Sequence, residues 1–294
     1  MTMFRLFASL ALVSVFAAAP SAQSDLDAFM AQVLARRDEN WKKLQQYTLS
    51  EDETFALTGT GGTRIYGFTR EYHWFPQDGI FVRSPTRADG VAISEEERRR
   101  AEERWIRREH DRERIRENEQ RDEVEPSLND LIDPSGQPRF VSSAYFMKFK
   151  FEPGHYALAG REKLLGRDVL RIEYYPARLY EEKGGKPPSD PTGARIQRSF
   201  NKVALITLWI EPAERQILQY EFQNIDFDFL PGRSMARVDE ISASMRMGEA
   251  FSGVWLPETI AMRFGMTLAI GTVEARYDVG YRDYREAVTA ARLR

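Results

Sequence analysis

The chain has 294 residues, with 42 Lys and Arg against 45 Asp and Glu, and a formal net charge of −3. This balance argues against a nucleic-acid partner, because nucleic-acid binding needs a basic face. The chain also has no cysteine, which excludes disulfides, thiolate nucleophiles, zinc–thiolate sites and a lipid attached to an N-terminal cysteine.

The first 22 residues have the pattern of an export signal. Arg5 precedes an apolar stretch over residues 6–19, and the small residues of 19–22 offer a cleavage site. The apolar stretch is short for a membrane anchor. We therefore predict a signal peptide over residues 1–22, cleaved near Ala22, and a periplasmic mature chain of residues 23–294. An uncleaved anchor is the alternative. The mature chain has no stretch of about 18 apolar residues, so we predict no integral membrane span in it.

Residues 24–47 are predicted to form an amphipathic helix that lies on a sheet. Ser24 and Asp27 have the spacing of a capping box, and large apolar residues recur at helical spacing. These residues are Leu26, Phe29, Met30, Val33, Leu34, Trp41 and Leu44.

From residue 48 onward the hydrophobic period changes to two, which indicates strands separated by glycine-containing turns. The last three strands alternate most clearly, and their turns are expected at Gly253 and Gly271. The predicted strands are 48–57, 63–75, 79–84, 143–152, a pair around Gly166-Arg167 within 155–176, 203–210, 215–226, and three between 241 and 279.

Two segments interrupt this strand pattern. Residues 94–125 are almost entirely charged, with a capping box at Ser94 and Glu97, which predicts an exposed helix. Its large apolar residues Trp105, Ile106 and Ile115 can touch the body of the protein at a few points. This helix is either a partner-binding arm or lid, or a solvated excursion between two strands. Residues 177–194 are rich in Pro and Gly and are predicted to form an open loop.

The fold class that follows is α+β. We expect one strongly curved antiparallel β-sheet, an open half-barrel, with the N-terminal amphipathic helix and the inserted charged helix covering or flanking one face. A β-sandwich without helical cover is the main alternative.

Several short motifs resemble the LolA/LolB-like periplasmic lipoprotein-carrier superfamily, which includes outer-membrane lipoprotein-sorting proteins. They are YALAGREKLLGRDVLRIEYYP at 156–176, LWIEPAERQILQY at 208–220, GVWLP at 253–257 and GYRDYR at 280–285. The resemblance implies a single half-barrel domain over residues 23–294 whose concave apolar face receives acyl chains. The insertion at 94–125 and the loop at 177–194 depart from the simplest carriers.

A half-barrel that holds acyl chains needs an adaptable apolar surface, and methionine suits this purpose because it is unbranched and polarisable. The alternative is that the same residues pack beneath the N-terminal helix. The candidate cavity-lining residues are Met245, Met247, Met262, Phe264 and Met266 on the strands, with Leu34 and Trp41 on the helix as the opposing wall.

Other chemistries have little support in the sequence. The three histidines show no metal-ligand spacing, and neither a nucleophile elbow nor a phosphate-binding glycine loop follows a strand. We therefore predict no catalytic residue, no metal and no cofactor. The leading hypothesis is a non-catalytic carrier or binding protein whose partner is a lipid, an acylated protein or another amphiphile. The alternatives are an interaction or sensor module that binds an envelope protein through residues 94–125, and a hydrolase of unrecognised type.

Overall fold

The computed structural model describes residues 19–118, 143–175, 204–224 and 236–287. In these residues eleven strands form one antiparallel sheet in the order β4-β3-β2-β1-β11-β10-β9-β8-β7-β6-β5. The sheet is not closed, since β4 and β5 lie at opposite edges. The α+β open half-barrel predicted from the sequence is confirmed.

The strand order reflects the path of the chain, which builds the sheet in two halves. The first half extends from the middle of the sheet to one edge through β1 (Tyr47–Thr58), β2 (Arg64–Gln77), β3 (Ile80–Ala88) and β4 (Val91–Ala92). The second half begins at the far edge with β5 (Tyr156–Leu164), β6 (Arg167–Tyr174), β7 (Ala204–Glu211) and β8 (Gln216–Asn224). It returns through β9 (Ala236–Phe251), β10 (Val254–Leu268) and β11 (Gly271–Glu286). The pairing of β1 with β11 therefore joins the two halves.

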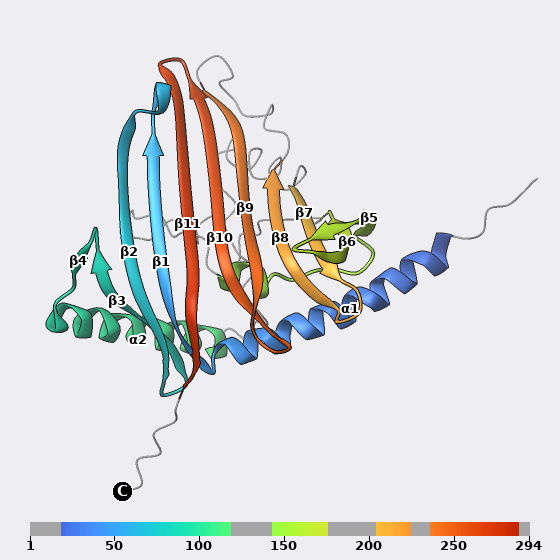
Figure 1. Cartoon of the computed structure of the whole chain (residues 1–294), viewed down its shortest axis with the longest axis horizontal. Helices are drawn as coiled ribbons and strands as arrows, with labels where there is room; N and C mark the ends of the chain where they lie inside the picture. The colour runs from blue at the N-terminus through green and yellow to red at the C-terminus, as the bar shows by residue number, and fades with distance from the viewer. Residues whose placement is uncertain (1–18, 119–142, 176–203, 225–235, 288–294) are drawn as a thin grey trace, which may run out of the picture.

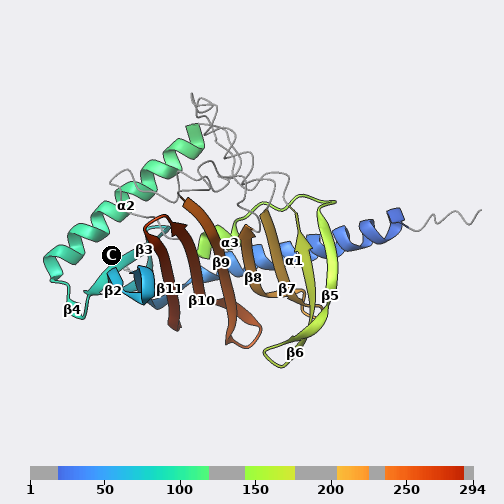
Figure 2. The same ribbon diagram turned by 90° about the horizontal axis from the view of Figure 1, so that it is seen from above.

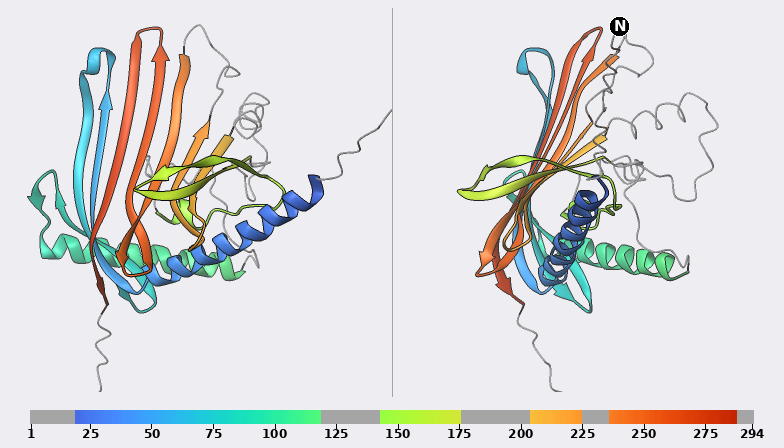
Figure 3. Two further views of the ribbon diagram at one scale, coloured as in Figure 1. Left: turned by 45° about the vertical axis from the view of Figure 1, so that its right-hand side comes forward. Right: turned by 90° about the vertical axis from the view of Figure 1, so that its right-hand side faces the viewer.

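The helices lie on one side of the sheet. The helix α1 (Ala19–Leu44) runs across the ends of the strands, and α2 (Glu95–Asn118) packs on β3. A short helix, α3 (Ser143–Met147), contacts α1. Figure 2 shows the sheet curving toward the helices, and Figure 3 shows α1 and α2 on the same side. We call this side the inner face.

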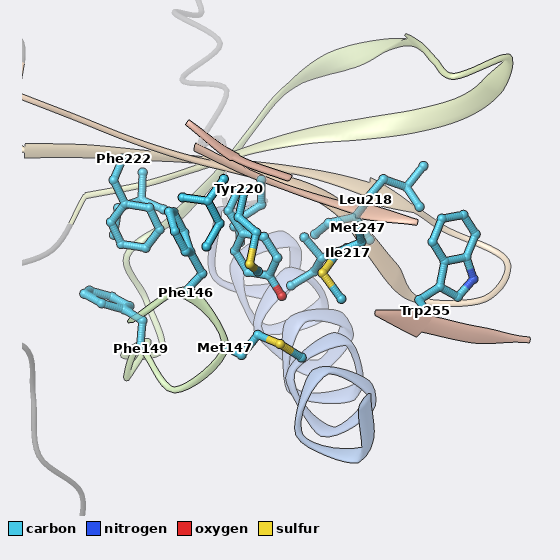
Figure 4. Close-up of a cluster of buried hydrophobic side chains, with 14 of the residues drawn as sticks. Phe146, Met147, Phe149, Ile217, Leu218, Tyr220, Phe222, Met247 and Trp255 are labelled. Atoms are coloured by element: carbon cyan, nitrogen blue, oxygen red, sulfur yellow. The ribbon is translucent and has the colours of Figure 1, made fainter. Parts of the chain in front are cut away.

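The core lies between the inner face and the helices α1 and α3. Met30 and Val33 of α1 are fully buried, and so is Phe146 of α3, whose ring centroid lies 5.1 Å from that of Phe222 on β8. Phe149 adds a further edge-on contact to Phe222 at 5.2 Å. Figure 4 shows these aromatic rings beside Met147, which points toward α1.

The structure corrects two of the sequence-based expectations about local structure. The strand predicted at 143–152 is absent. Residues 143–147 form α3 instead, with Phe146 and Met147 both buried, and the irregular segment after it pairs with no described strand although Phe149 and Phe151 alternate with exposed Lys148 and Lys150. Ser24 does not cap the first helix, since α1 already begins at Ala19. Asp27 instead accepts a hydrogen bond of 3.0 Å from the backbone nitrogen of Gly154.

The charged helix forms largely as predicted. The capping box is present, with Ser94 Oγ accepting from the backbone nitrogen of Glu97 at 3.3 Å and Glu97 Oε2 accepting from the backbone nitrogen of Ser94 at 3.4 Å. The pair Glu96–Arg100 also forms, at 2.5 Å. The predicted end of this helix at 119–125 and the loop at 177–194 lie outside the described residues.

Candidate functional site

Paired residues of an antiparallel sheet share a face, so the strand register maps the inner face directly. One row of paired residues crosses five strands, and it is apolar until it reaches an acid at its end. The row consists of Tyr220, Met245, Ile260, Val279 and Glu53. The inner face therefore has an apolar part on β8–β11 and a polar part that begins on β1.

The apolar part continues along β10 toward the β10–β11 turn. Every second residue of the strand faces inward, and these residues become more exposed with distance from the core. Ile260 is only 1% exposed, and Ile270 in the following turn is 92% exposed. The residues between them are half-buried: Met262, Phe264, Met266 and Leu268. We call this series the β10 ladder.

The described helices do not extend over the outer half of the β10 ladder. In Figures 1 and 3, α1 and α2 both lie near one end of the strands. The turn between β10 and β11 is at the other end, away from both helices. Ile241 and Ala275 flank Phe264 in register, so the apolar surface is wider than one strand. This surface can receive a hydrocarbon chain by burial alone.

The structure brings all five predicted strand residues to this one face. Met245 and Met247 belong to the core, at 0% and 1% exposure. Met262 packs against the core, as do Leu34 and Trp41 of α1. Phe264 and Met266 lie farther out on the β10 ladder.

A buried polar cluster occupies the inner face of β1, β2, β3 and β11. We call it the Glu–Arg cluster; it consists of Glu51, Glu53, Tyr72, Trp74, Arg83 and Tyr277. Glu51 accepts hydrogen bonds from Arg83 and, at 2.6 Å, from Nε1 of Trp74. Glu53 accepts from the hydroxyl of Tyr277 at 2.8 Å. Both carboxylates are almost fully buried.

The charges in this cluster are only partly balanced. Nη2 of Arg83 lies 3.4 Å from Glu53 Oε1 while it also pairs with Glu51. Glu53 Oε2 is buried without a hydrogen-bond partner, and its nearest cation is Nη1 of Arg70 at 3.9 Å. The buried guanidinium of Arg83 therefore pairs with two buried carboxylates, those of Glu51 and Glu53.

Burial sets the direction of the pKa shifts here. It raises the pKa of the Glu51 carboxyl, an effect that Arg83 opposes. Burial alone would lower the pKa of Arg83, but the neighbouring Glu51, Tyr72 and Glu53 outweigh it and raise that pKa. Burial, reinforced by Glu53, also raises the pKa of Tyr277. Arg83 is thus held cationic, and we interpret the cluster as a structural element that ties the strands together.

The helix α2 attaches beside this cluster. Nε1 of Trp105 donates to the backbone oxygen of Phe81 at 3.1 Å, and the Trp105 ring meets that of Trp74 edge-on at 5.5 Å. Ser84 donates to Glu102. Trp105 is therefore a contact point of the charged helix, as predicted from the sequence.

Neither the Glu–Arg cluster nor the exposed end of the β10 ladder was predicted as a site. The cluster does have a signal in the sequence, because the inward positions of β1 read Leu49, Glu51, Glu53 and Phe55. Two acids at alternate positions interrupt an apolar face, and such acids need buried partners. Their partner Arg83 could not be identified without the strand register.

Within the described residues, no three or more His, Asp or Glu side chains gather in a way that could hold a metal ion. The same part of the chain contains no helix with the length and apolarity that membrane crossing requires.

Comparison with family models finds no match, and comparison with curated proteins finds none either. Solved structures give distant likenesses. A DUF1329 family protein from Desulfovibrio piger is 11% identical, with 92% of this chain and 93% of that chain covered and a TM-score of 0.37. A putative outer membrane lipoprotein-sorting protein domain from Vibrio parahaemolyticus is 13% identical, with 87% and 92% covered and a TM-score of 0.37.

A third likeness is to the MucA/MucB complex of Pseudomonas aeruginosa, at 10% identity, 88% and 98% coverage and a TM-score of 0.19. TM-scores this low do not support inferences about this chain from these structures.

Proposed function

We propose that this protein is a non-catalytic carrier or binding protein of the periplasm that holds the hydrocarbon chain of a lipid, lipoprotein or other amphiphile against the inner face of its sheet. The observation that supports this most is the β10 ladder, whose half-buried Met262, Phe264 and Met266 lead from the core toward the end of β10 that the described helices leave uncovered. The periplasmic location rests on the signal sequence predicted at 1–22.

The energetics of such binding are favourable without polar anchors. Each methylene removed from water contributes roughly 0.8 kcal/mol, so a single acyl chain along the ladder would give useful affinity. Methionine and phenylalanine side chains can adapt to chains of different shape. Leu34 and Trp41, which pack against the core from α1, would form the opposing wall at the inner end.

Native mass spectrometry tests this proposal directly. The protein is purified from periplasm without detergent, its mass is measured, and the bound material is extracted in solvent and identified. We expect a discrete added mass of a lipid or acylated peptide that Phe264→Glu and Met262→Glu remove. Ala261→Glu is the matched control, because Ala261 lies on the same strand and points to the opposite face. Circular dichroism confirms that each variant is folded.

A mass without addition, which persists after incubation with phospholipids, would contradict the carrier proposal. Equal loss of the added mass in Ala261→Glu and Phe264→Glu would contradict the placement of the chain on the inner face.

A second candidate function is binding of an envelope protein through α2. This candidate is supported by the exposure of most of that helix, which contacts the sheet at β3. Deletion of 94–125 in cells, followed by crosslinking, tests it. Retention of every crosslinked partner after the deletion would exclude α2 as the binding element.

A further inference from the structure

Two turns that are far apart in the sequence meet at one end of the sheet. The β1–β2 turn, with a short 3-10 helix (Thr60–Gly62), lies beside the β10–β11 turn. The backbone nitrogen of Thr272 donates to Thr60 Oγ1 at 3.0 Å and joins them. We call residues 59–66 together with 269–272 the distal tip.

The distal tip exposes large apolar side chains. Ile270 is 92% exposed, Ile65 is 59% exposed and Tyr66 is 55% exposed. A single exposed apolar residue is ordinary on a protein surface, whereas several that gather at one point mark an interaction site. Tyrosine has an apolar ring and a polar hydroxyl, which suits a boundary between hydrocarbon and water.

The charge pattern of the tip fits a lipid surface. Residues 54–70 and 259–273 contain neither Asp nor Glu, although acids are frequent elsewhere in the chain. Arg64 is exposed in the tip and forms no ion pair with a described residue. Two acids flank the tip on neighbouring strands. Glu274 of β11 is paired in register with Thr58 and lies 3.8 Å from Arg276, and Asp239 of β9 accepts from Thr267 Oγ1 at 2.7 Å. These positions limit insertion to the turns themselves.

The tip is continuous with the apolar inner face. The β10 ladder runs from buried Ile260 to exposed Ile270, and on the other side of the tip the Tyr66 ring lies 6.1 Å from that of Phe55 and 6.2 Å from that of Phe68. An apolar path therefore leads from the exposed turns into the body of the protein. A protein partner would not need such a path, whereas a bilayer would supply hydrocarbon at its open end.

We propose that the distal tip docks on the surface of an anionic phospholipid membrane, with Ile65, Tyr66 and Ile270 at the level of the headgroups and the upper acyl chains and Arg64 beside the lipid phosphates. This inference goes beyond the proposed function, because membrane docking is measurable on the mature chain whether or not it carries a ligand.

Co-sedimentation with vesicles tests the inference. The mature chain is mixed with vesicles of phosphatidylglycerol and phosphatidylethanolamine, and separately with phosphatidylcholine vesicles. We expect partition onto the anionic vesicles that falls about tenfold in Ile270→Glu, the loss expected for one large apolar side chain. Ile65→Glu should give a similar decrease. Leu165→Glu is the matched control, because Leu165 is also an exposed apolar turn residue, at 57%, between β5 and β6.

Two outcomes would overturn the inference: no partition of the wild-type chain onto anionic vesicles, or equal losses in Leu165→Glu and Ile270→Glu. Light scattering without vesicles tests the alternative that the tip binds a second copy of the chain. If Ile270→Glu converts a dimer to a monomer while vesicle binding is absent, the tip is a contact between copies and the membrane proposal is wrong.

Discussion

The side chain of Arg83 on β3 reaches over β2 to pair with Glu51 on β1, two strands away. On the way it lies over the ring of Tyr72, with the guanidinium carbon 3.5 Å from the ring centroid. One side chain thus connects three strands near the edge of the sheet. A cation over an aromatic ring and an ion pair reinforce each other when both are removed from water.

Replacement of Arg83 by methionine is expected to destabilise the protein by about 3–5 kcal/mol at neutral pH, because it leaves buried Glu51 without its cation and leaves Glu53 only the more distant Arg70. Urea denaturation measures the change in unfolding free energy. Arg282→Met is the matched control, since Arg282 pairs with Asp52 of the same strand β1 but is 54% exposed. Such an exposed pair contributes at most about 1 kcal/mol, so similar losses in both variants would contradict the role of Arg83.

The pH dependence of stability should report on Glu51. Burial raises its pKa above the ordinary value of 4.5, so between that value and the folded-state pKa the folded chain binds more protons than the unfolded chain. The contribution of Glu51 to the unfolding free energy therefore rises as pH falls through this interval. We expect wild type to gain stability relative to Glu51→Gln as pH is lowered from neutral toward 4.5, measured by urea denaturation at a series of pH values. A difference that stays constant or shrinks would show that Glu51 does not titrate in this way.

The alternation of apolar residues was sufficient to predict most of the strands. Strands β9, β10 and β11 have one polar and one buried face, and this pattern is local, so it can be read without tertiary information. The segment at 143–152 was predicted wrongly although Phe149 and Phe151 alternate with exposed Lys148 and Lys150 as in a strand, because the segment pairs with no described strand. The two rings pack instead on Tyr174 of β6 and Phe222 of β8, and alternation alone does not show whether a pairing partner exists.

The site was less predictable than the fold for a related reason. Met262, Phe264 and Met266 share a face by their spacing alone, but their partial exposure depends on where α1 crosses the sheet relative to β10. The partnership of Arg83 with Glu51 depends on the order β3-β2-β1 and on its register. Neither relationship has a local signature.

Removal of the Trp105 indole should loosen α2 from the sheet. This residue provides both the hydrogen bond to Phe81 and the ring contact to Trp74. In Trp105→Ala we expect faster amide hydrogen exchange in residues 95–111, with exchange in β9–β11 unchanged. Arg107→Ala on the exposed side of the same helix serves as the control. Unchanged exchange in Trp105→Ala would mean that other contacts hold α2 in place.

The distal tip offers a test of close packing between its two turns. Gly271 has a φ of +135°, and a Cβ built there would lie 1.9 Å from Thr60 Oγ1. Gly271→Ala must therefore displace Thr60 and break its hydrogen bond with the Thr272 nitrogen. Gly79→Ala is the matched control, because Gly79 also has a positive φ, of +83°, but a Cβ there would meet nothing within 4 Å.

Both alanine variants carry a backbone cost of positive φ, which is larger at +135° than at +83°, and only Gly271→Ala adds the contact with Thr60. We expect Gly271→Ala to lower the unfolding free energy by about 1–3 kcal/mol more than Gly79→Ala, and to accelerate amide exchange at residues 59–63. Equal effects of the two substitutions would show that the turns can separate without cost. In that case the apolar residues of the tip would not be held together as one surface.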